Sequence, residues 1–108
     1  MSMEWISGNV MIRPMSFAAA GDVVEGHAHN FDHTSIVFCG AVRVRCVLRN
    51  GFVREQEFRA PAHFLVLAGV EHRIEALEPD TVVWCVYSHR TPQGDVVQDW
   101  DGWGPGYV

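Results

Sequence analysis

The sequence predicts an all-β domain, a barrel or sandwich of short antiparallel strands. Short β-branched and aromatic runs recur at close spacing, and Gly, Pro and Asn residues separate them. No segment shows a 3.6-residue apolar period of useful length, which excludes a mainly helical domain. The chain has 108 residues, 48% of them hydrophobic and 19% charged, so we expect one globular domain.

The expected strands of the first part of the chain begin in "NVMIRPMSFA", with an interruption at Pro14 because proline cannot donate a backbone hydrogen bond. A turn at Gly21 and Asp22 leads into "VVEGHAH", which predicts the next strand. The run "HTSIVFC" predicts a strand that ends at Cys39, before Gly40.

The clearest hairpin lies in the middle of the chain. Apolar and charged residues alternate up to Leu48, Asn50 and Gly51 form the turn, and residues 52–58 return. Further along, "HFLVL" is expected as a short buried run, while "RIEAL" and "TVVWCVYS" are expected as strands. The turns between them are "AGVEH" and "EPD".

Charge and cysteine content narrow the class of protein. The net charge of −5 argues against nucleic acid and anionic membranes as partners. No apolar run approaches the roughly 18 residues of a membrane span, and no secretory signal is expected. Three cysteines without CxxC spacing, Cys39, Cys46 and Cys85, favour buried thiols in a reducing cytoplasm.

Three of the six histidines, His27, His29 and His33, lie within seven residues. In a strand, His27 and His29 point to the same face, about 7 Å apart, which permits one shared metal ion. His33 would lie about 13 Å further along a straight strand, so a shared ion requires a bend, and Asn30 and Asp32 are turn formers. A helical HExxH arrangement of His29 and His33 is disfavoured, because Asn30 stands where the glutamate belongs.

The stretch "GDVVEGHAHNFDHTSIVFCG" resembles the first motif of the cupins, G-x5-H-x-H-x3-E-x6-G. All spacings match, from Gly21 to Gly40, and His33 occupies the position of the usual glutamate. The second cupin motif is weaker: "LAGVEHRIEA" supplies Gly69 and His72 at the right spacing. Leu67 replaces its proline and Ala76 replaces its asparagine.

The resemblance implies a single-domain cupin, a jelly-roll barrel or double-stranded β-helix, over residues 1–88. Its mouth would hold one divalent transition-metal ion (Mn, Fe, Co, Ni, Cu or Zn) on four residues, by position His27, His29, His33 and His72. Similar small cupins carry four histidines at this spacing and are commonly homodimers. Without a carboxylate ligand the ion would keep its full charge and act as a stronger Lewis acid. Two of six coordination positions would remain for a substrate or dioxygen.

Other residues are expected near the metal. Barrel interiors are filled by one face of each strand, which suggests that Ile74, Val83 and Cys85 point inward. Phe31 lies in the expected bend, where it would gate the mouth. The Gly-rich arm of residues 89–108 carries Trp100, Trp103 and Tyr107 and is expected to pack on the barrel or on a partner subunit.

The function that these patterns favour is a metal-dependent, oxygenase-type enzyme for a small organic molecule. The residues show no catalytic set apart from the metal ligands. A non-catalytic module that senses a small molecule or a metal stays open, and a sugar isomerase or epimerase is a weaker alternative. Two readings without a metal also stay open, one with ordinary polar or core histidines and one with a cupin fold that has lost its ion.

Overall fold

The structure, a computed structural model, describes residues 4–29, 31–48 and 50–96, and the side chain of His27 lies outside this description. The described part contains β-strands and no helix, which confirms the all-β prediction. The strands are β1 (Trp5–Ser7), β2 (Val10–Phe17), β3 (Val23–His27), β4 (His33–Cys39), β5 (Ala41–Val47), β6 (Val53–Arg59), β7 (Ala62–Val66), β8 (Glu71–Ala76) and β9 (Thr81–Ser88). Nowhere in the described ranges is there a helix long and apolar enough to cross a membrane.

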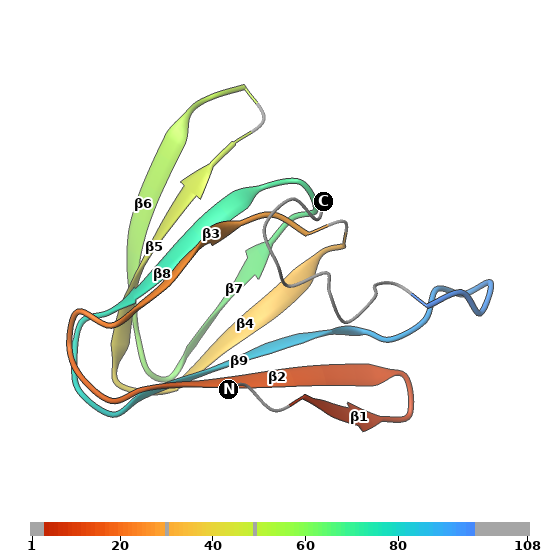
Figure 1. Cartoon of the computed structure of the whole chain (residues 1–108), viewed down its shortest axis with the longest axis horizontal. Helices are drawn as coiled ribbons and strands as arrows, with labels where there is room; N and C mark the ends of the chain where they lie inside the picture. Colours follow the sequence, from red (N-terminus) through yellow and green to blue (C-terminus); the bar gives the residue numbers. More distant parts are fainter. Residues whose placement is uncertain (1–3, 30, 49, 97–108) are drawn as a thin grey trace.

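Two antiparallel sheets pack face to face as a jelly roll (Figure 1). The first sheet has the order β1-β2-β9-β4-β7, and the second has the order β3-β8-β5-β6. Alternate residues of the strands point between the sheets and fill the core. On β9, Val83, Cys85 and Tyr87 are buried (0%, 1% and 6% exposed), whereas Val82, Trp84 and Val86 are only half-buried.

Three local expectations are wrong. The thiol of Cys39, at the end of β4, is exposed and not buried. Pro14 does not interrupt β2, which continues to Phe17 in register with β9. Pro14 lies beyond the part of β2 that β1 covers, so that edge of the strand needs no donor there. The run "HFLVL" is not wholly buried, because β7 is an edge strand whose side chains alternate, and Leu65 is 61% exposed.

The expected hairpin is present between β5 and β6. The backbone amide of Phe52 donates to the Oδ1 atom of Asn50 over 3.0 Å, and the amide of Leu48 donates to the carbonyl oxygen of Phe52 over 2.8 Å. Gly51 has a φ angle of 87°, which favours glycine. Local turn chemistry therefore sets the register of this hairpin.

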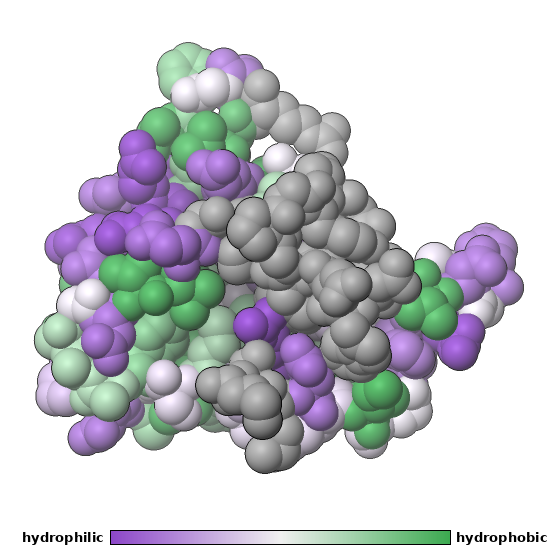
Figure 2. All heavy atoms as spheres, viewed as in Figure 1, coloured by the Kyte–Doolittle hydropathy of each residue, from purple (hydrophilic) through white to green (hydrophobic). Residues whose placement is uncertain are grey.

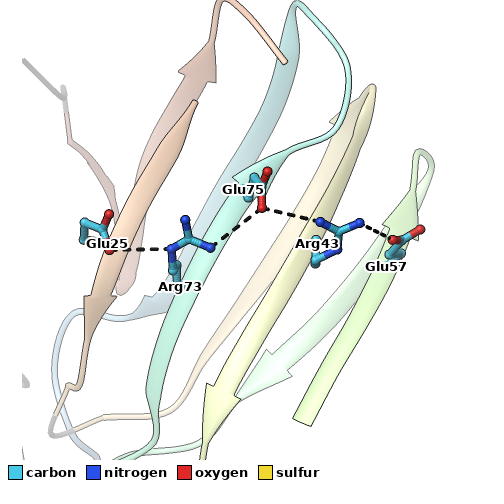
Figure 3. Close-up of polar contacts among 5 residues, drawn as sticks. All are labelled: Glu25, Arg43, Glu57, Arg73 and Glu75. Atoms are coloured by element: carbon cyan, nitrogen blue, oxygen red, sulfur yellow. Dashed lines mark hydrogen bonds and ion pairs between the residues drawn. The ribbon is translucent and has the colours of Figure 1, made fainter. Parts of the chain in front are cut away.

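The outer face of the four-stranded sheet is charged. Alternating acidic and basic side chains form a ladder of ion pairs across its four strands (Figure 3). The members in order are Glu25, Arg73, Glu75, Arg43 and Glu57, at 3.6, 3.7, 3.6 and 2.9 Å. Hydrophilic residues gather on the left of Figure 2, over the strands of this sheet. Such exposed pairs contribute little stability, but they mark the face as one that contacts water.

The outer face of the five-stranded sheet is apolar and aromatic. The ring of Trp84 on β9 makes edge contacts with Trp5 on β1, at a centroid distance of 5.3 Å, and with Phe38 on β4, at 4.7 Å. Trp5 and Phe38 remain 45% and 48% exposed. An apolar patch across several strands is typical of a contact surface.

Candidate metal centre

Three predicted ligands meet at one end of the space between the sheets. His33 is the first residue of β4, His72 lies on β8, and His29 lies in the loop between β3 and β4. Their exposed fractions are only 2%, 3% and 2%, respectively. The ring centroids are 5.3 Å apart for His29 and His33, 5.3 Å for His29 and His72, and 5.1 Å for His33 and His72.

The predicted bend between His29 and His33 is present, because β3 ends before it and β4 begins after it. The Oδ1 atom of Asp32 accepts a hydrogen bond from the amide of Ala68 over 2.7 Å. The amide of Gly69 donates to the carbonyl oxygen of His29 over 2.8 Å. These two bonds join the loops that carry the two motifs, and the strand at His33 excludes the helical HExxH alternative.

The ring of His72 has a defined orientation. Its Nδ1 atom lies 3.2 Å from the carbonyl oxygen of Val70. A carbonyl oxygen only accepts, so Nδ1 carries the proton of the neutral ring and Nε2 carries the lone pair. A backbone carbonyl on one ring nitrogen is the usual partner of a histidine that coordinates metal through the other nitrogen.

His27 is the fourth predicted ligand. Its backbone is the register partner of His72 on the neighbouring strand, next to a bulge in β3. Its side chain lies outside the described residues, so the four-histidine set stays a prediction. Among the side chains that are described, no group of three His, Cys, Asp or Glu residues has the arrangement of a metal site, so a shared ion would require the rings of His29, His33 and His72 to reorient.

An aromatic wall closes one side of the histidine cluster. Phe31 stacks on His29, with ring centroids 4.8 Å apart and planes at 22°, and it also contacts Tyr87 at 4.3 Å. Phe31, Tyr87 and Met11 form a buried apolar cluster. Phe31 therefore lies beside the cluster, as expected from its place in the bend, while its role as a gate stays a prediction.

The register shows how deep the other predicted pocket residues lie. Cys85 pairs with Ser35, one inward position beyond His33 on β4. Ile74 is the next inward position beyond His72 on β8, and both Ile74 and Cys85 are 1% exposed. Val83 pairs with Val37, one further step into the core. A pocket role for Ile74, Val83 and Cys85 stays a prediction.

The structure also places two residues near the centre that were not expected there. Arg13 pairs with Cys85 and follows Met11 at the next position of the same parity on β2, so an arginine lines the inner wall. Burial lowers the pKa of the Arg13 guanidinium, which Glu4 and the neighbouring thiol partly offset. Cys46 pairs with His72. The alternation of Met11, Arg13, Met15 and Phe17 was the available signal for Arg13, and the expected break at Pro14 obscured it.

Burial also sets the protonation of Cys85. It raises the pKa of the thiol from 9.0 to about 11, although Ser35, whose Oγ atom lies 3.4 Å from Sγ, and Arg13 act in the opposite direction. The thiol therefore stays protonated at neutral pH and is a poor nucleophile.

This shift predicts a loss of stability in alkali. Below pH 9 the thiol is protonated in both folded and unfolded states, whereas between pH 9 and 11 only the unfolded chain releases the proton. The free energy of unfolding should fall over this window by about 2–3 kcal/mol more in the parent than in a Cys85→Ser variant. Urea unfolding at pH 8, 9.5 and 11 measures the free energy of unfolding of both proteins. The same decrease with pH in the parent and in Cys85→Ser would contradict the prediction.

The comparisons with known proteins detect similarity in structure. No protein-family model matches this chain, and no curated protein matches it. A single-residue variant of Bacillus subtilis oxalate decarboxylase matches 93% of this chain and 25% of its own, with a TM-score of 0.75 and 19% identity. The formate complex of Lactobacillus farciminis oxalate decarboxylase matches 76% of this chain and 24% of its own, with a TM-score of 0.68 and 22% identity. KdgF from Halomonas sp. matches 81% of this chain and 76% of its own, with a TM-score of 0.65 and 24% identity.

This chain thus spans about a quarter of the oxalate decarboxylase chains and about three quarters of the KdgF chain. At these identities the similarity concerns the fold. Both kinds of neighbour are cupin-fold proteins, and the two facing antiparallel sheets agree with them in their arrangement. The fold is therefore the cupin jelly roll that the first motif indicates.

Proposed function

We propose that this chain is a metal-binding cupin in which His27, His29, His33 and His72 hold one divalent transition-metal ion. The observation that carries the proposal is the contact among three buried imidazoles, with centroids 5.1 to 5.3 Å apart. If each ring nitrogen lay about 2.1 Å from a shared ion, the centroids would be about 4.6 to 5.3 Å apart for octahedral to tetrahedral angles. The orientation of His72 through Val70 supports the same role.

The donor set suits the ion. Neutral imidazoles bind Mn, Fe, Co, Ni, Cu and Zn alike, so the residues do not select one metal. When bound, the ion would supply Lewis-acid chemistry, and redox chemistry if it is Mn, Fe or Cu. Among the described strand residues that point inward, none is Asp or Glu. The inward positions of the described strands therefore offer no carboxylate for general acid–base catalysis.

We infer an oxygenase-type reaction on a small organic molecule. The wall of Met11, Phe31 and Tyr87 excludes water from the histidines, and Arg13 supplies a positive charge one step deeper. A water-poor, cationic site favours a substrate that carries negative charge. The absence of an inward carboxylate on the described strands equally suits a module that only retains a ligand, which is the second candidate.

Elemental analysis of purified protein, beside a variant with His27→Ala and His29→Ala, tests the metal. We expect about one transition-metal ion per chain in the parent and a much lower content in the variant. Oxygen consumption with enediols, diketones, phenols and thiols then separates the two candidates: turnover supports the enzyme, and tight ligand retention without oxygen uptake supports the sensor. A parent that takes up no metal after incubation with Mn, Fe, Ni, Cu and Zn would overturn the proposal.

We also propose that two copies of the chain pair through the outer face of the five-stranded sheet. The aromatic row of Trp5, Trp84 and Phe38, in which Trp5 and Phe38 are exposed, supports this pairing, because interfaces are enriched in aromatic residues. Light scattering should show a dimer for the parent and a monomer for Phe38→Glu. A monomeric parent would contradict it. Residues 97–108 of the predicted arm lie outside the described residues, so the contact of the arm stays a prediction. The cytoplasmic location is a separate prediction.

A further inference from the structure

An apolar cleft opens between β6 and β7, the edge strands of the two sheets. It holds ≈ 550 Å³ of empty space, part of it open to solvent. Apolar side chains from both sheets form most of its wall, among them Val44, Leu48, Phe58, Phe64, Val66 and Val70. Two polar side chains of β6, Arg54 and Gln56, also line it.

The cleft lies beside His72 in the register of the four-stranded sheet, although none of the described histidines lines it. His72 pairs with Cys46, and Cys46 pairs with Arg54. Cys46 lines the cleft and is half-buried. Since neighbouring strands lie about 4.8 Å apart, the Cα atoms of His72 and Arg54 are about 10 Å apart. A ligand that contacted both Arg54 and the histidines would therefore have to span about 10 Å.

The charge of Arg54 is available to a ligand. Two basic residues of the outer face, Arg43 and Arg73, are engaged with acidic neighbours. Within the residues that the structure describes, Arg54 takes part in no ion pair. It shares the inward parity of Phe58, and its electrostatic influence reaches the thiol of Cys46. An apolar cleft with the guanidinium of Arg54 in its wall complements an amphipathic anion.

We propose that this cleft binds the apolar body of a small organic carboxylate whose charged end contacts Arg54. The other end of the ligand would approach the histidine cluster, so the inference rests on the proposed function for its reactive end. A span of about 10 Å corresponds to a chain of about eight carbon atoms or an aryl group with a short acid arm. The class of substrate is thus an amphipathic organic acid.

Octanoate is the probe, and neutral octan-1-ol is its uncharged match. Amide chemical shifts of the ¹⁵N-labelled full chain should change at Leu48, Phe58 and Val66 with both probes. Because Arg54 is exposed, octanoate should bind about two- to fivefold more tightly than octan-1-ol. Arg54→Gln should remove this preference. Arg45→Gln, on the outer face of the adjacent strand, should keep it and is the matched control.

A Gln56→Trp variant should weaken the binding of both probes, since Gln56 is exposed and its replacement fills the cleft without a change in the core. Equal preference for octanoate in Arg54→Gln and the parent would overturn the role of Arg54. Shifts confined to another surface would overturn the cleft itself. Metal content, measured on each protein, separates the two proposals: a metal-loaded parent without shifts refutes the cleft alone. Octanoate binding by a parent that takes up no metal refutes the metal centre and the link to it.

Discussion

A His72→Asn variant is expected to fold as the parent does and to lose its metal ion. The asparagine amide keeps a donor near the position of Nδ1, so the hydrogen bond to the carbonyl oxygen of Val70, 3.2 Å in the parent, can persist. The variant lacks an equivalent of Nε2, the nitrogen that we assign to the metal. Loss of a direct ligand should weaken metal affinity by more than about 100-fold, since even outer partners of ligands account for 10- to 100-fold.

Competition with a chromophoric chelator measures this affinity, and circular dichroism of the metal-free proteins measures the fold. His63→Asn is the matched control, because His63 is exposed on β7, away from the cluster. It should bind metal as the parent does. A His72→Asn variant with the parent's affinity would show that His72 serves only the packing of the loop.

The spacing of the first motif predicted the bend that brings His29 and His33 together. It placed a bend between His29 and His33, and the structure shows why such a bend is needed: two strands of different sheets must meet at one end. His72 was predicted from a weaker pattern, and its register opposite His27 is consistent with that prediction. Alternation likewise predicted the buried face of β9, because one face of each sheet packs against the other sheet.

The surroundings of the histidines were harder to predict because they depend on which strands become neighbours. Arg13 lies about 70 residues from Cys85 in sequence, and only the pairing of β2 with β9 brings them together. The cleft lined by Arg54 arises where two edge strands of different sheets face each other. Local patterns carry no information on such long-range pairs. The exposure of Leu65 follows for the same reason, since hydrophobicity alone does not mark an edge strand.

The Gly40→Ala variant is expected to be among the least stable single variants of this chain. Gly40 is the one residue between β4 and β5, which belong to different sheets, and its φ angle is 79°. A Cβ atom there would lie 2.2 Å from Oγ1 and 2.9 Å from the Cα atom of the buried Thr81. The side chain of Thr81 can rotate only by giving up its 2.9 Å hydrogen bond to the carbonyl oxygen of Glu78, and its backbone belongs to β9.

Gly21→Ala is the control that separates strain from collision. Gly21 has a φ angle of 92°, but a Cβ atom there would meet nothing within 4 Å. The left-handed backbone alone should lower the free energy of unfolding by about 1–2 kcal/mol. Gly40→Ala adds overpacking and should lower it by about 2–5 kcal/mol in total. Urea unfolding of both variants measures these two losses in the free energy of unfolding. Equal losses would mean that β9 moves away from the added methyl group, and the glycine that ends the first motif would then be needed only for its backbone angle, not for the close passage of two sheets.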